Sequence, residues 1–137
     1  MRPMRDKIFV DSNVWLYMAN NDSPEKKSIS LNLLNRDTYT SPQVLFECIN
    51  VCRKKLKLNS EIAFSFAENL LQVNKLIEEN ANIVYTALQL CRQNSFQPFD
   101  AKIVATALEA GCNTLYSEDM HHGLLVNNSL RIINPFI

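Results

Sequence analysis

Short runs of strand-forming residues alternate with longer helical segments along this 137-residue chain, and this alternation most strongly limits its fold. The strand-like runs lie at residues 7–10, 38–40, 114–116 and 131–133. Successive parallel strands need crossover connections, which are usually helices, and such a sheet is covered by helices on both faces. We therefore predict an α/β fold, a three-layer α/β/α sandwich around a central, mainly parallel sheet.

The intervals between these runs carry helix signals. Ser23-Pro24 and Ser41-Pro42 each pair a capping residue with a first-turn proline. Gly111 follows an alanine-rich segment at the position where helices commonly end. Residues 71–82 have no clear pattern and receive no assignment. The predicted helices cover 14–19, a segment from 24 through 34, a segment from 42 through 56, a segment from 60 through 70, and 83–90 and 100–110.

Length and composition limit the class of protein. A chain of 137 residues suits one domain, which we expect to span residues 1–137. The formal net charge is zero, so total charge gives no argument for a nucleic-acid binder, although local patches can still attract phosphate. The four cysteines form no C-x-x-C pair, which argues against a zinc ribbon and favours reduced thiols. We see no signal peptide and no apolar run long enough to cross a membrane, and we expect a cytoplasmic protein.

Acidic residues directly follow two of the predicted strands. Ile8, Phe9 and Val10 run into Asp11, and the strand at 114–116 is followed by Ser117-Glu118-Asp119. An ionised carboxylate is costly beside a buried strand. Ligands of open parallel sheets bind outside the carboxyl ends of the strands. These two parts of the chain therefore bring acids to one edge of the sheet.

Two helices add acids to the same edge. At 100° per residue, Glu47 falls beside the apolar face of its helix, and Asp100 lies within the apolar face of its own. Each acid alone has an ordinary explanation: Asp11 or Asp100 as a helix cap or first-turn acid, and Glu47 as a satisfied boundary residue.

The combination of four acids calls for a counter-ion. Asp11, Glu47, Asp100 and Asp119 would repel one another at one sheet edge, and a divalent cation would neutralise them. All-oxygen ligands favour Mg²⁺ or Mn²⁺ over zinc or copper. Such an ion activates water and binds phosphate oxygens, so the implied reaction is hydrolysis of a phosphodiester.

Three stretches resemble the PIN-domain nucleases, in particular the VapC-like toxins of bacterial toxin–antitoxin pairs. They are IFVDSNVWLYMAN, SPQVLFECINVCRKKL and FDAKIVATALEAGCNTLYSEDMHHG. The resemblance extends from Ile8 to the last strand, and it is specific because the order and spacing of all four acids agree. It implies a PIN-like fold, a Mg²⁺- or Mn²⁺-dependent endoribonuclease, a homodimer, and a cognate antitoxin that covers the acidic pocket.

The resemblance also assigns roles to residues. Asp11, Glu47, Asp100 and Asp119 match the four acids of the family in order, as metal ligands and catalytic groups. Ser12 stands where the family often has Thr, Ser117 matches the Ser or Thr that accompanies the fourth acid, and Asn13 shapes the loop. Lys102 departs from the apolar residue of many relatives, and we expect it to reach solvent.

Several polar residues have competing interpretations. The basic cluster Arg53, Lys54, Lys55 and Lys57 is either solvated surface or a track for the RNA backbone, and its place on the helix of Glu47 favours the second. We expect Glu118 to be a solvated acid and His121-His122 to lie on the surface.

Other functions remain open at this point. A PIN-like module could bind RNA or a protein without cleaving, or the enzyme could be a housekeeping RNA-processing nuclease. A haloacid-dehalogenase-like phosphatase needs D-x-D after the first strand, where this chain has D-S-N. A Rossmann domain needs a glycine-rich first turn, which is absent.

Overall fold

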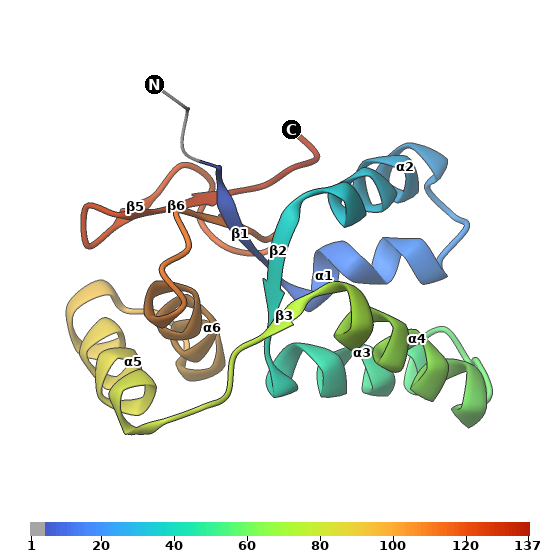
Figure 1. Ribbon diagram of the computed structural model, residues 1–137, viewed down its shortest axis with the longest axis horizontal. Helices are drawn as coiled ribbons and strands as arrows, with labels where there is room; N and C mark the ends of the chain where they lie inside the picture. Colours follow the sequence, from blue (N-terminus) through green and yellow to red (C-terminus); the bar gives the residue numbers. More distant parts are fainter. Residues whose placement is uncertain (1–4) are drawn as a thin grey trace.

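The computed structural model describes residues 5–137 and has a six-stranded sheet at its centre (Figure 1). The strand order is β3-β2-β1-β4-β6-β5, and only β5 runs antiparallel to its neighbour. The predicted domain 1–137 includes residues 1–4, which lie outside the described residues. The strands are β1 (Lys7–Val10), β2 (Asp37–Thr40), β3 (Lys75–Leu76), β4 (Thr114–Tyr116), β5 (Leu125–Val126) and β6 (Leu130–Ile133).

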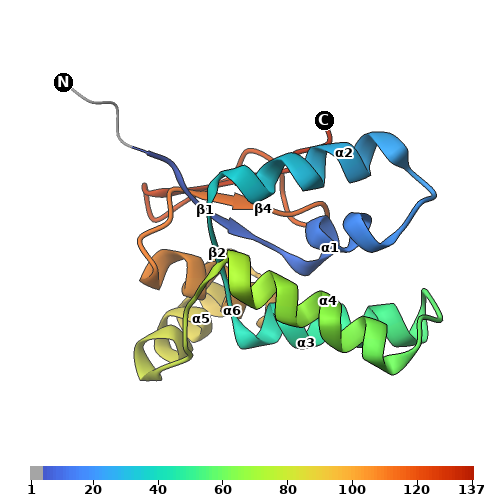
Figure 2. The same ribbon diagram turned by 45° about the vertical axis from the view of Figure 1, so that its right-hand side comes forward.

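Helices cover both faces of this sheet. Figure 2 shows α2 on one side of the strands and α3 to α6 on the other. The predicted three-layer α/β/α sandwich with a mainly parallel sheet is confirmed. The helices are α1 (Ser12–Trp15), the 3-10 turn η1 (Leu16–Ala19), α2 (Pro24–Asn32), η2 (Leu33–Asn35), α3 (Pro42–Lys54), α4 (Ser60–Val73), α5 (Ala81–Asn94) and α6 (Pro98–Glu109).

The central strand β1 is buried on both faces. Ile8, Phe9 and Val10 have no exposed surface, because the helical layers pack on the sheet from both sides. Trp15, one turn further along, is also fully buried, so the entry into α1 is fixed by the core. This packing places the residue after β1 at a defined point of the sheet edge.

The sequence signals mark most helix ends correctly. Ser41 caps α3 through its side chain, and Pro42 takes the first turn. Gly111 adopts φ +75 just after α6, a conformation that glycine reaches without strain. α6 begins two residues earlier than predicted, at Pro98, because the side chain of Gln97 accepts hydrogen bonds from Phe99 and Asp100.

Two short strands were missing from the prediction. The unassigned region 71–82 contains the end of α4, the two-residue strand β3 and the start of α5, whose cap is Asn80. β5 also has two residues and pairs antiparallel with β6. Strands this short show no measurable alternation of apolar and polar residues. They form the two edges of the sheet.

No helix within residues 5–137 is long and apolar enough to cross a membrane. The four cysteines are free, as predicted, and Cys91 is the least buried of them.

Candidate active site

Asp11 stands at the end of β1, held by the neighbouring strand. Its backbone N–H donates to the Tyr116 carbonyl of β4 at 2.9 Å. Its Oδ1 accepts from the Ser12 N–H at 2.8 Å, and its Oδ2 accepts from the Ser117 hydroxyl at 2.9 Å. Asp11 therefore does cap α1, and its carboxylate is also fixed from the far side by the segment after β4.

Asn13 links the ends of β1 and β4. Its side-chain N–H₂ contacts Asp119 Oδ2 at 3.2 Å, Ser117 Oγ at 3.3 Å and Asp11 Oδ2 at 3.4 Å. Its Oδ1 accepts from the Glu118 N–H at 3.0 Å. Two donor hydrogens are shared among three acceptors, so each of these contacts is weak. Together they keep the first and fourth acids close while both carboxylates retain free lone pairs.

Glu47 comes from α3, which begins at the carboxyl end of β2. Its side chain is half-buried, and Oε1 has no hydrogen-bond partner within residues 5–137 although it is shielded from solvent. Burial and, to a smaller extent, the charge of Asp11 raise the pKa of Glu47 to about 7, against the lowering by Gln43 and Lys102. An unpaired buried oxygen of this kind is costly unless a ligand satisfies it.

Asp100 lies in the first turn of α6, where its N–H donates to Gln97 Oε1 at 3.1 Å. Burial raises its pKa, and the charge of Asp119 adds to the effect. Asp11 is only 7% exposed. Burial raises the pKa of Asp11 to about 6 against the lowering by Ser117 and Ser12, with smaller contributions from the charges of Asp100 and Asp119.

All four predicted acids line one cavity of about 460 Å³. The structure therefore brings Asp11, Glu47, Asp100 and Asp119 together, as the sequence predicted for one sheet edge. Within residues 5–137, however, no three His, Cys, Asp or Glu side chains are arranged tightly enough to enclose an ion by themselves. The site is an open acidic hollow. The rest of the lining is Ser12, Asn13, Leu16, Tyr17, Asn20, Val51, Lys55, Leu56, Ile103 and Glu118.

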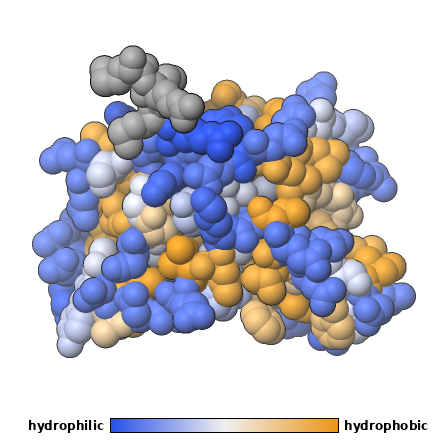
Figure 3. Space-filling model, in the orientation of Figure 1, coloured by the Kyte–Doolittle hydropathy of each residue, from blue (hydrophilic) through white to orange (hydrophobic). Residues whose placement is uncertain are grey.

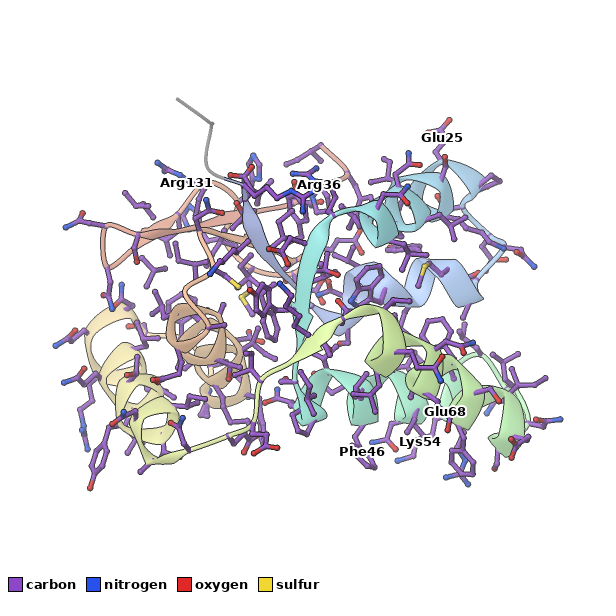
Figure 4. All side chains as sticks on the ribbon, in the orientation of Figure 1. Glu25, Arg36, Phe46, Lys54, Glu68 and Arg131 are labelled. Atoms are coloured by element: carbon purple, nitrogen blue, oxygen red, sulfur yellow. The ribbon has the colours of Figure 1, made fainter. Side chains whose placement is uncertain are left out.

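The other predicted residues divide into those at the cavity and those outside it. Ser117 is fully buried against Asp11. Of the basic cluster, Lys55 lines the cavity, and Arg53, Lys54 and Lys57 do not. Figure 4 shows Lys54 on the side of α3 that faces away from the sheet. The role of the cluster in RNA binding stays a prediction.

Two expectations about exposure met different outcomes. Lys102 was expected to reach solvent, but its Nζ pairs with Glu79 at 3.0 Å and its side chain is only 25% exposed. The ammonium lies near enough to Glu47 to lower its pKa. His121 and His122 are exposed, as predicted.

Glu118 was predicted to be a solvated acid, and this was wrong. It accepts from the Tyr17 hydroxyl at 2.6 Å and from Lys26 Nζ at 2.6 Å. Burial alone would raise its pKa, but the Lys26 and Tyr17 hydrogen bonds outweigh this and lower it. Lys26 and Glu118 are 92 residues apart, so no local pattern could have indicated the pair. The network neutralises Glu118 and anchors the loop that carries Asp119.

The fold and the site define a class: an α/β sandwich with an acidic cavity at the carboxyl ends of its parallel strands. Within that class, the chain belongs to the PIN domain family, whose family model matches residues 8–122. No curated protein matches the chain significantly.

Solved structures with the same fold come from bacterial toxin–antitoxin systems. Mycobacterium tuberculosis VapC20, described as a sarcin-ricin loop cleaving toxin, has a TM-score of 0.66 and 22% identity over 82% of this chain and 89% of its own. A toxin–antitoxin complex from Klebsiella pneumoniae has a TM-score of 0.69 and 16% identity over 93% and 97%. DNA-bound VapBC from Salmonella typhimurium has a TM-score of 0.66 and 18% identity over 92% and 96%. At these identities the likeness establishes a common fold.

Proposed function

We propose that this chain is a metal-dependent endoribonuclease that hydrolyses RNA phosphodiesters and serves as the toxin of a toxin–antitoxin pair. The observation that carries the proposal is the single cavity lined by four carboxylates from four separate segments. Four carboxylates with a purely structural role would not need to converge. Their convergence is costly, because each charge raises the energy of the others' ionised forms. Membership of the PIN family and the toxins among the similar structures support the same proposal.

The residues present fit Mg²⁺ or Mn²⁺. The donor set is all carboxylate, and Glu47 Oε1 is buried without a hydrogen-bond partner among the described residues. Mg²⁺ keeps several waters and binds through few protein carboxylates, so an open hollow suits it better than a closed cage would. Asp11, Asp100, Asp119 and Glu47 would hold the ion. When bound, it would lower the pKa of a water and stabilise charge on a phosphate oxygen.

The protein contributes positioning around these acids. Ser12 and Ser117 fix the Asp11 carboxylate through one hydrogen bond to each oxygen. Asn13 keeps Asp119 beside Asp11, and the Lys26–Glu118 pair holds the loop after β4. Such support keeps a reactive group within the small tolerance that catalysis requires.

Cleavage of total cellular RNA tests the proposal directly. We expect discrete new RNA ends with Mg²⁺ or Mn²⁺ and none in excess EDTA, because the acids cannot stabilise a phosphoryl transition state alone. Mapping the ends would identify the cleaved sequence. Equal cleavage in EDTA would refute metal dependence. RNA that is bound but never cut would favour the non-catalytic module.

The antitoxin is proposed on charge complementarity. Without an ion, the four acids make a negative, partly buried hollow, and a guanidinium pairs with carboxylates in a planar fork. We propose an antitoxin segment that presents an Arg or Lys to Asp11, Glu47, Asp100 and Asp119. A co-purifying protein that inhibits the chain, and that loses this inhibition when its basic residue is changed to Ala, would support this. Harmlessness of the chain when expressed alone would favour a housekeeping nuclease instead.

We also propose that the chain is a homodimer. Large apolar side chains are exposed on α3, α5 and the start of α6, including Phe46 at 65% and Phe99 at 60%. A hollow lined by Val84, Leu88 and Phe99 lies between α5 and α6, and Figure 3 shows further apolar residues on the face over these helices. Patches of this kind mark protein interfaces. A monomeric mass by light scattering would refute the dimer.

A further inference from the structure

The cavity continues beyond the four acids into a part with different chemistry. One wall is formed by Leu16, the first residue of η1, and by Asn20, which follows η1. The other is formed by Val51, Lys55 and Leu56 on α3 and the turn after it. Lys55 follows Glu47 by eight residues, which is about 12 Å along a helix. The far part of the cavity is therefore apolar on two sides, with one ammonium group and one carboxamide group.

Lys55 is the one cation in the lining of this cavity. Its backbone is held at the end of α3, where its N–H donates to the Val51 carbonyl at 2.9 Å and the Leu56 N–H donates to the same carbonyl at 3.1 Å. Within residues 5–137 no carboxylate lies within ion-pair distance of its side chain. The fifth acid of the lining, Glu118, is already paired with Lys26. Lys55 is thus available to an anionic ligand.

The Asn20 side chain uses one of the four hydrogen bonds that it can make. Its Oδ1 accepts from the Asp22 N–H at 2.9 Å, which fixes the amide plane. Its N–H₂ group donates to no partner within the described residues. A fixed amide donor beside apolar walls is suited to read an acceptor on the edge of a planar ring.

We propose that this part of the cavity is a subsite for one unpaired nucleotide, adjacent to the phosphodiester that is cut. The base would lie against Leu16, Val51 and Leu56, its edge would accept from Asn20, and its phosphate would pair with Lys55. The subsite rests on the proposed nuclease function and specifies its substrate as single-stranded RNA. A base within a duplex cannot enter a hollow between two helices, because it must first leave its stack.

Charge supports a nucleotide over an apolar peptide as the occupant. The unpaired ammonium of Lys55 attracts a phosphate group, whereas an apolar chain segment would leave Lys55 without a counter-charge. The distance of about 12 Å between Glu47 and Lys55 along α3 also leaves room for a sugar and base between them.

Two variants and one matched control test the subsite. Lys55→Ala removes the phosphate partner, and Asn20→Ala removes the edge donor. Arg92→Ala removes an equal charge from an exposed position of α5, which lies outside the cavity lining and outside the basic cluster. The substrates are short single-stranded RNAs that differ at one nucleotide beside the cleavage position, and Mn²⁺ affinity is measured separately by calorimetry.

We expect Lys55→Ala to raise KM about tenfold with kcat little changed, because a phosphate contact far from the acids is the same in ground and transition states. Asn20→Ala should flatten the preference among the four nucleotides. Mn²⁺ affinity should stay at the wild-type value in both, and Arg92→Ala should change neither KM nor preference.

Failure of the subsite can be separated from failure of the nuclease. If the wild type cleaves but Lys55→Ala and Asn20→Ala behave like Arg92→Ala, the subsite is overturned. If the wild type does not cleave, the subsite is tested by binding alone. Fluorescence anisotropy then compares the binding of the same RNAs to Asp100→Asn with and without the Lys55→Ala change. Weaker binding after Lys55→Ala then supports the subsite without the nuclease, and unchanged binding overturns both. Loss of antitoxin affinity without any change in RNA kinetics would assign this part of the cavity to a protein occupant and overturn the proposal.

Discussion

Asp11→Asn is expected to abolish most RNA cleavage, lowering kcat by about a hundred- to a thousandfold, or about 3–4 kcal/mol of transition-state stabilisation. The substitution keeps the shape of the side chain and its acceptor for the Ser12 N–H. It removes the most deeply buried charge of the cavity, and with it one ligand of the proposed ion. Steady-state cleavage kinetics and Mn²⁺ calorimetry on the same preparation measure the two effects.

The control is Asp22→Asn, which removes an exposed acid outside the cavity. It should retain wild-type kinetics. Because Asp11 is desolvated, Asn at this position should not lower thermal stability in EDTA near pH 8, so an unfolded variant cannot explain the loss. Full activity of Asp11→Asn would show that Asp11 is not a catalytic group.

The second large effect is a loss of metal-free stability as pH rises. In the folded protein the pKa of Asp11 is raised from 3.8 to about 6, and that of Glu47 from 4.5 to about 7. At a pH between the lower and the raised pKa of each carboxyl group, the folded state binds more protons than the unfolded state. The free energy of unfolding therefore falls as pH rises through the window from about 4 to 7. Raised carboxyl pKa values therefore act against stability at neutral pH.

Thermal melts in EDTA measure this loss. Between pH 5 and pH 8 we expect the free energy of unfolding to fall by about 3 kcal/mol, on the basis of 1.36 kcal/mol per pKa unit. That corresponds to a decrease of about 10 °C in Tm for a domain of this size. Saturating Mg²⁺ should remove most of the decline, because it binds the ionised carboxylates. The double variant Asp11→Asn, Glu47→Gln should show a much flatter profile in EDTA, with a small decline left from Asp100, whose pKa is also raised. A profile as steep as that of the wild type would assign the effect to other groups.

The sequence determines much of the fold through local signals. The Ser-Pro starts of α2 and α3, the apolar run of β1 and the stop at Gly111 each depend on neighbouring residues, and all appear in the structure. β3 and β5 were missed because two-residue strands exist only through pairing with distant strands. Their formation is a tertiary event that local propensity does not encode.

The sequence also indicated where two acids of the site lie. Strand ends in a parallel sheet share one edge, so Asp11 and Asp119 could be placed together before the structure was known. The partners of Glu118 could not, because Lys26 reaches it from a helix on another part of the chain. The contribution of Lys102 near Glu47 also depends on how α6 packs, which no local pattern gives.

The two-residue strands at the edges of the sheet have a consequence for assembly. β3 and β5 leave very little unpaired backbone for another strand to join, and Lys75 adds a charge at the β3 edge. Long, flat, apolar edges invite edge-to-edge pairing and fibre growth, and short or charged edges discourage it. A strand from a second polypeptide therefore has no adequate template along either border. We therefore expect association to use helical surfaces and the protein to have little tendency to form β-aggregates.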